Sequence, residues 1–194
     1  MNVPRMNVIA TLSAGLQGAL LLARGNPEGL RLVENDHASV RYSFWAIPLC
    51  LPAVIGMKLM SWGSTKMPPQ AALNMGRYLL LFVIGWLLFV WMSHHLSEAL
   101  KTQARWPRFI ALWAYCSVIG NTLAALGTVP GLLGVPSMLS QASEVVTYGW
   151  AIWLEWYAIR LSLEVGGLTA AGLVVVDIII SVAMAVLSVA GSSQ

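Results

Sequence analysis

The stretch YLLLFVIGWLLFVWM, from Tyr78 to Met92, decides the fold class of this chain. It contains no charged side chain, and Asn74 and Arg77 precede it. An α-helix rises about 1.5 Å per residue, so about 20 apolar residues cross a hydrocarbon core near 30 Å thick. The sequence therefore predicts a membrane-spanning helix over residues 74–93.

The rest of the chain has the same character. Hydrophobic residues make up 58% of the 194 residues and charged residues only 10%. Soluble domains carry roughly 25% charged residues, so this composition excludes a disordered chain, a coiled coil and an ordinary soluble enzyme. We expect an all-α fold, a multi-pass helical membrane bundle of about five transmembrane helices. The predicted spans are residues 42–62, 74–93, 107–126, 144–160 and 168–189.

The first of these spans contains Pro48 and Pro52, four residues apart. Each proline removes a backbone donor, so we expect a bend near both positions. Gly127 to Ser137, rich in Gly and Pro, is interpreted as the turn after the third span.

The first 40 residues differ from the rest and form a separate cytoplasmic segment, ahead of a transmembrane domain over 41–194. A helix over 8–23 is expected, and no convincing cleavage site follows it. This favours an amphipathic helix, along the membrane interface or against the bundle, over a cleaved signal peptide. A polar stretch after Pro27 completes the segment. The apolar residues at helical spacing are Ile9, Leu12, Leu16, Leu20 and Ala23.

The basic residues predict how the chain is threaded. With a cytoplasmic N-terminus, eight of the eleven Lys and Arg residues fall on the inner side. The positive-inside rule then places the C-terminus outside. Short loops and an uncleaved N-terminus suit a bacterial inner membrane. No basic run suggests nucleic-acid binding, so membrane lipids are the expected partners.

Two acids lie deep inside predicted spans. Asp177 sits in LVVVDIIIS and Glu155 in AIWLEWYAI. A carboxylate at the bilayer centre costs roughly 2.5–3.5 kcal/mol on insertion scales and should face the bundle interior. Glu144 and Tyr148 share a helix stripe with Glu155, and Asn121 adds an amide from the third span. These five residues form either a proton or solute site, or a set of structural interhelical hydrogen bonds.

A direct pair of the two acids is not expected from the residue count. With the connecting turn centred near Leu163, Glu155 lies eight residues before it and Asp177 fourteen after it. At 1.5 Å per residue, their depths differ by about 9 Å. A proton relay would then need Asn121, Tyr148 or water between them.

No catalytic or cofactor motif is present, so we expect neither enzyme activity nor a cofactor. His94, His95 and Glu98 follow the second span as H-H-x-x-E. They resemble part of a metal site, but a third protein ligand would have to be the distant His37. A hydrated interfacial helix end is the preferred interpretation. Cys50 and Cys116 lie in apolar runs and are interpreted as small buried hydrophobes.

Two local patterns resemble the Yip-type family of Rab-interacting membrane proteins and its bacterial relatives: RFIALWAYCSVIGN (108–121) and RLSLEVGGLTAAG (160–172). A polar N-terminal segment followed by five closely spaced helices is also similar. The resemblance covers residues 40–190 and implies a non-enzymatic integral membrane protein that acts through protein or lipid contacts, including self-association. The alternative is a small transporter or channel subunit that uses Glu155 and Asp177.

Overall fold

The structure, a computed structural model, describes residues 8–63 and 70–190, and within these ranges it is built from helices without strands. The predicted all-α fold is confirmed. Two short 3-10 turns, η1 (Pro27–Leu32) and η2 (Gln103–Arg105), lie in the connections. The α-helices are α1 (Val8–Ala23), α2 (His37–Ser43), α3 (Ala46–Gly63), α4 (Ala71–Ala99), α5 (Trp106–Leu132), α6 (Ser137–Leu163) and α7 (Gly167–Ala190).

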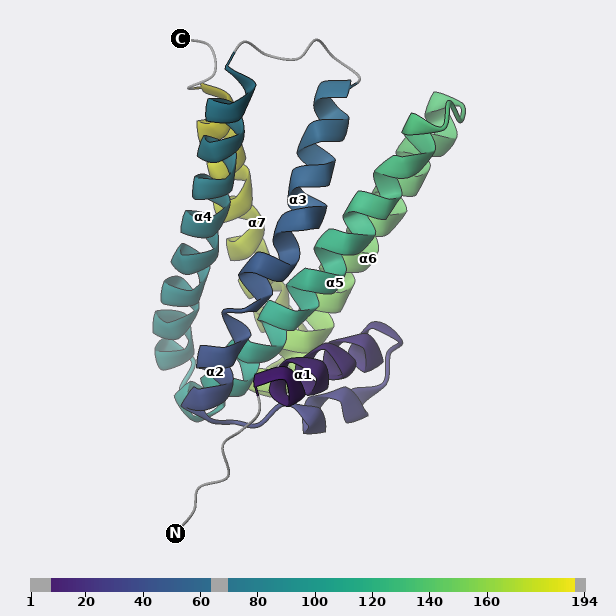
Figure 1. Cartoon of the computed structure of the whole chain (residues 1–194). Helices are drawn as coiled ribbons and strands as arrows, with labels where there is room; N and C mark the ends of the chain where they lie inside the picture. Colours follow the sequence, from purple (N-terminus) through teal and green to yellow (C-terminus); the bar gives the residue numbers. More distant parts are fainter. Residues whose placement is uncertain (1–7, 64–69, 191–194) are drawn as a thin grey trace.

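The helices α3 to α7 run side by side along one axis, and α1 lies across one end of them (Figure 1). We call this end the α1 end and the other the far end. Successive long helices alternate in direction, so the α4–α5 and α6–α7 connections both lie at the α1 end. Towards the far end, the α5–α6 hairpin leans away from α4 and α7.

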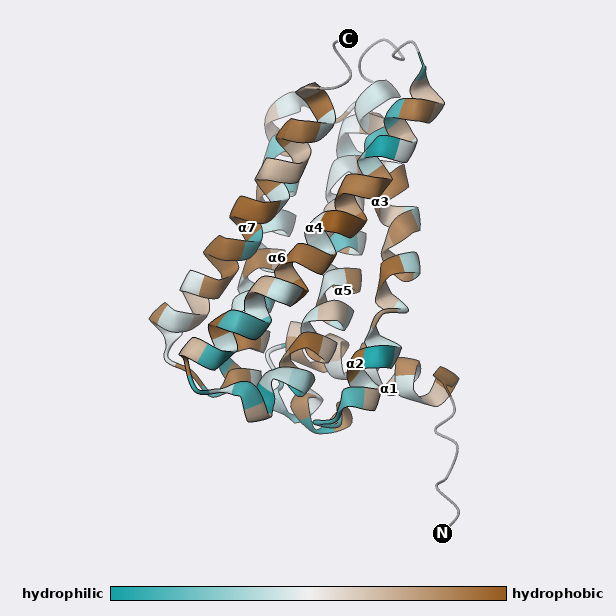
Figure 2. Ribbon diagram, turned by 90° about the vertical axis from the view of Figure 1, so that its left-hand side faces the viewer, coloured by the Kyte–Doolittle hydropathy of each residue, from teal (hydrophilic) through white to brown (hydrophobic). Residues whose placement is uncertain are grey.

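The outer faces of the long helices are apolar, as a bilayer requires. On α4, Leu80, Ile84, Leu87 and Trp91 recur at helical spacing and are 42 to 60% exposed. Figure 2 shows hydrophilic residues gathered at the α1 end and long hydrophobic stretches on α4 and α7. A water-soluble protein rarely exposes such continuous apolar faces. The chain is therefore a multi-pass integral membrane protein.

Four helical segments are long and apolar enough to cross a membrane: His37–Gly63, Ala71–Ala99, Gln103–Leu132 and Gly167–Ala190. The predicted span over 144–160 corresponds to α6, which is less apolar and is not among these four. It is nevertheless 27 residues long, like α5, and runs antiparallel beside it (Figure 1). The polar residues of α6, which include the enclosed Glu155, make it less apolar than the other long helices.

The N-terminal helix is present with the predicted bounds, and its apolar residues divide between the bundle and the outside. Ile9 and Leu20 are exposed, at 75% and 46%. Leu12, Leu16 and Leu22 pack against the bundle together with small residues, and a side chain at Gly15 would collide with the Tyr115 ring of α5. Close helix contact favours small residues at this crossing, while the exposed apolar residues face outward, towards the membrane interface.

The first span is interrupted before its first proline. Helix α2 ends at Ser43 and α3 begins at Ala46, with Phe44 and Trp45 between them. Pro48 has no N–H for the Phe44 carbonyl four residues earlier, and its ring would clash with that group. The Phe44 oxygen accepts from Ile47 N instead, at 3.1 Å. Pro52, by contrast, lies within α3.

The interpretation of residues 127–137 as a turn was wrong for most of the segment. Helix α5 continues through Gly127 and Pro130 to Leu132, and α6 already begins at Ser137. A side chain at Gly127 would collide with Thr147 of α6. This glycine therefore permits close packing of α5 against α6 rather than a turn.

The α1 half of the bundle is tightly packed. The rings of Phe89, Trp113 and Trp86 contact one another in series at tilted angles, with neighbouring centroids 4.5 Å and 4.6 Å apart. Polar contacts secure the connections at this end: Arg105 and Glu164 form an ion pair of 2.6 Å. Asp36 caps α2 by accepting from Ser39 N at 2.8 Å, which holds the pKa of its carboxyl below the usual value.

Candidate functional site

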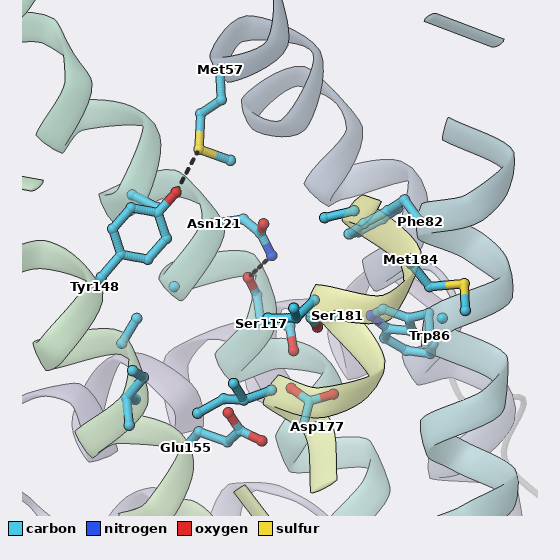
Figure 3. Close-up of a pocket in the computed structure, with 18 of the residues that line it drawn as sticks. Met57, Phe82, Trp86, Ser117, Asn121, Tyr148, Glu155, Asp177, Ser181 and Met184 are labelled. Atoms are coloured by element: carbon cyan, nitrogen blue, oxygen red, sulfur yellow. Dashed lines mark hydrogen bonds between the residues drawn. The ribbon is translucent and has the colours of Figure 1, made fainter. Parts of the chain in front are cut away.

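A cavity of about 630 Å³ lies inside the bundle, between α4 and α7 on one side and α5 and α6 on the other (Figure 3). Helix α3 contributes Met57 near its upper end in this view. The adjacent rings of Trp86 and Trp113 form part of its wall. The leaning of the α5–α6 hairpin thus accompanies an internal space between the helices.

Glu155 and Asp177 lie together at one end of this cavity (Figure 3). Their carboxyl groups are within hydrogen-bonding reach of each other, and the Glu155 carboxyl also reaches the Trp113 side chain. Both residues are deep within the bundle yet partly accessible, because they face the cavity. The expectation that the two acids would lie at different depths was therefore wrong.

The error lies in the position of the α6–α7 turn. Helix α6 continues to Leu163, and Glu164 then takes a left-handed conformation with φ 54° before α7 starts at Gly167. The turn is thus centred on Val165 rather than Leu163. Counted from there, Glu155 lies ten residues back and Asp177 twelve forward, a difference of about 3 Å in rise. The two side chains can therefore meet without a relay.

Two of the other predicted site residues also line the cavity. The amide of Asn121 donates to the Ser117 carbonyl at 2.8 Å, and it lies between the acid pair and the far end (Figure 3). The Tyr148 hydroxyl approaches Met57 Sδ at 4.0 Å. Glu144 is not among the lining residues, so the predicted stripe contributes only two of its three members.

The polar groups of the cavity lack a basic counterpart. None of the lining residues that the structure describes is Lys, Arg or His. Two buried polar atoms of the described lining residues also have no hydrogen-bond partner in the described ranges: Glu155 Oε1, an acceptor, and Trp86 Nε1, a donor. Buried polar groups are normally paired, so these two atoms mark a place where water or a ligand completes the bonding.

Aromatic side chains form a part of the site that the sequence interpretation missed. Trp113 lies in the predicted span over 107–126, where it is 3% exposed and lines the cavity together with the two acids. Phe82, Trp86 and Phe89 fall at i, i+4 and i+7 on one face of α4. That spacing is the signal that identifies the inner face of this helix.

The histidine cluster lies elsewhere. His94 and His95 are in the last turns of α4, at the α1 end, and Glu98 Oε1 and Oε2 lie 3.6 Å from His94 Nε2 and 3.4 Å from His95 Nδ1. All three side chains are about half exposed. Over residues 8–63 and 70–190, no group of three or more His, Cys, Asp or Glu is arranged to hold a metal ion.

Comparisons of the chain with protein-family models, curated proteins and solved structures give no match.

The juxtaposition of the two acids predicts a chemical cross-link. With Cys50 and Cys116 replaced by Ala, Glu155→Cys and Asp177→Cys together should react with a short bis-methanethiosulfonate reagent as one bridged adduct. The control combines Glu144→Cys with Asp177→Cys, because Glu144 lies eleven residues, about 16 Å, further along α6. Intact-mass spectrometry distinguishes one bridge from two separate adducts. Equal bridging in both variants would contradict the described pair.

Proposed function

We propose that the protein is a small proton-coupled membrane transporter, or a subunit of one, in which Glu155 and Asp177 form the proton-binding site. The observation that carries this proposal is that two carboxyl groups from different helices lie together in one membrane-embedded cavity, whose described lining contains no Lys, Arg or His. In this proposal the protein is not an enzyme, and it needs no cofactor.

The electrostatics of the pair support a proton site. Two ionised carboxylates in contact repel each other, and an apolar environment strengthens the repulsion. The pair avoids this cost by holding a proton between its oxygen atoms, or by holding a cation. Structural hydrogen bonding alone would not need two acids, because an amide at either position would supply the interhelical hydrogen bond without this repulsion.

The difference in packing between the α1 half of the bundle and the half that holds the cavity also supports transport. The aromatic layer of Phe89, Trp113 and Phe109 closes the α1 half beneath the acid pair. Beyond the pair, the cavity extends past Asn121 towards Tyr148 and Met57 near the far end (Figure 3). A site in mid-membrane that is closed to one side and accessible from the other is what one state of an alternating-access cycle requires.

The proposed orientation places the α1 end in the cytoplasm of a bacterial cell, at its inner membrane. Seven of the Lys and Arg residues that the structure describes lie at the α1 end, and two, Lys58 and Arg77, lie towards the far end. This distribution follows the positive-inside rule with the C-terminus outside. The cavity then faces the outer side of the membrane.

This orientation predicts the behaviour of reporter fusions. Alkaline phosphatase, which is active only outside the cytoplasm, should be active when fused after Gln194. Fused after Lys101, in the α4–α5 connection at the α1 end, it should be inactive, while green fluorescent protein should show the opposite pattern. An inactive phosphatase at the C-terminus would contradict the threading and the number of crossing helices.

A second candidate function follows from the resemblance to Yip-type proteins. A polar N-terminal segment followed by five long helices has the plan of that family, and such a protein acts through contacts with other membrane proteins or lipids. The exposed apolar residues Ile9 and Leu20 on α1 favour a lipid contact at the interface. This candidate does not require the acid pair, so substitutions of the two acids separate it from the transport proposal.

The transport proposal predicts that both acids are needed for proton movement. In proteoliposomes with an imposed membrane potential, the wild-type protein should carry protons, measured with a trapped pH-sensitive dye. Asp177→Asn and Glu155→Gln should each reduce this flux at least tenfold. The amide retains hydrogen-bonding capacity but does not exchange the proton at neutral pH, so folding should persist.

Glu144→Gln provides the matched control, because Glu144 lies on α6 outside the cavity lining. Its flux should equal that of the wild type. Wild-type protein without proton flux, or full flux in a variant that lacks both Glu155 and Asp177, would contradict the transport proposal and leave the contact function.

A further inference from the structure

We propose that the cavity binds a lipophilic organic monocation, which enters sideways from the bilayer between α6 and α7 and displaces the proton held by Glu155 and Asp177. This inference rests on the proposed proton site and names the class of solute that shares it. Three features of the described residues support it: the charge of the cavity, its aromatic walls and the position of its opening.

The charge of the cavity selects a cation. The acid pair holds the only carboxyl groups among the described lining residues, and no basic side chain accompanies them. When the pair releases its proton, the cavity loses one positive charge, and binding of one monovalent cation restores its net charge. A monovalent cation in exchange for one proton leaves the net charge of the membrane interior unchanged, which avoids the cost of an uncompensated buried charge.

The walls select an organic cation over a metal ion. Aromatic rings from three helices border the space, namely Tyr78, Phe82 and Trp86 of α4, Trp113 of α5 and Tyr148 of α6. Ring faces attract ammonium and similar cations, most strongly away from water. Ca²⁺ takes six to eight oxygen ligands, and Mg²⁺ needs octahedral oxygen coordination. A volume of about 630 Å³ instead matches the usual range for small-molecule sites, about 300–1,000 Å³.

The opening faces the membrane rather than water. Ile152 on α6 and Ile178 and Val182 on α7 line the cavity, yet they are 42%, 38% and 57% exposed. Helices α6 and α7 diverge beyond their shared turn (Figure 1). The exposure of these lining residues therefore points to an opening of the cavity between the two helices. Its rim is apolar and lies beside the lipid-facing side of α7. A solute that partitions into the bilayer reaches the acid pair by this route without crossing a polar surface.

The titratable groups around the pair are few. Cys116 faces Glu155 from α5, Tyr78 faces the cavity from α4, and Tyr148 faces it from α6. Helix α3 contributes only Met57 to the described lining. The pH dependence of cation binding is therefore that of the acid pair: binding should strengthen as pH rises and weaken as the pair regains its proton.

Tetraphenylphosphonium and tetraphenylborate test the proposal, because they have nearly the same size and opposite charge. The probes are titrated against the purified full chain in detergent, with tryptophan fluorescence as the readout. Tetraphenylphosphonium should bind and release about one proton, measured with a pH indicator in weak buffer. Its affinity should rise about tenfold per pH unit while one proton is released per cation. Tetraphenylborate should bind at least tenfold more weakly.

Variants separate the parts of the site. Glu155→Gln and Asp177→Asn should each weaken tetraphenylphosphonium binding at least tenfold, whereas Glu144→Gln should stay within twofold of the wild type. Tyr148→Phe should retain affinity and Tyr148→Leu should lose it several-fold, because the ring rather than the hydroxyl faces the cation. Thermal unfolding of each variant verifies that the bundle is intact.

The outcomes distinguish this inference from the transport proposal. Equal binding of both probes, or binding that is independent of pH or of the acids, would overturn the inference. Absent cation binding in a protein that still conducts protons would overturn the inference alone. Cation binding with proton release, in a protein that conducts no protons, would support the site and overturn the transport proposal.

Discussion

Glu155 and Asp177 meet in the middle of a bundle whose other described charged residues lie towards its two ends. This contact sets the requirements for the surrounding helices. The two acids must be shielded from lipid, because an acid facing hydrocarbon is costly, and they must reach a polar space through which a proton can exchange. The bundle meets both requirements by enclosing the pair among α4, α5, α6 and α7 and leaving a cavity on one side of it.

The register of α6 and α7 places the acids opposite each other, and contacts at their turn hold that register. Trp156 Nε1 of α6 donates to the Gly167 carbonyl at the start of α7, at 2.9 Å. Arg105, just ahead of α5, pairs with Glu164 in the turn itself. Gly167 and Glu164 lie at the α1 end, ten residues before Asp177 and nine after Glu155, or about 15 Å along each helix. The closed half of the bundle therefore positions the site, while the α5–α6 hairpin diverges to form the cavity.

The sequence predicted the helices better than it predicted their ends. The apolar runs determined the helical class and all five long segments, because hydropathy and helix length are local properties. The ends were wrong where close packing outweighed local preference: Gly127 resembled a turn residue, yet it lies inside α5 against Thr147. Similarly, the apolar spacing of α1 predicted a helix but did not single out Gly15, which permits the close approach of the Tyr115 ring.

The candidate site was likewise predicted only as far as local sequence properties allowed. The rarity of acids in apolar runs was sufficient to single out Asp177 and Glu155, and Asn121 and Tyr148 followed from helix spacing. Their direct contact depended on the position of one turn, and a shift of two residues in its centre removes most of the supposed difference in depth. Glu144 shares a stripe with Glu155 but lies nearer the far end, outside the cavity lining. The aromatic lining of the cavity could not be predicted, because tryptophans in a membrane protein are equally expected at the membrane interfaces.

Infrared difference spectroscopy of the protein in lipid, recorded across a pH titration, tests the shared proton most directly. The carbonyl stretch of a protonated carboxyl group reports each acid. If the two groups form one unit, the wild-type signal titrates in two coupled steps, and in Glu155→Gln or Asp177→Asn the remaining acid titrates in a single step at a pH different from both. If the two single-variant spectra simply add up to the wild-type spectrum, the acids act independently and the paired site is contradicted.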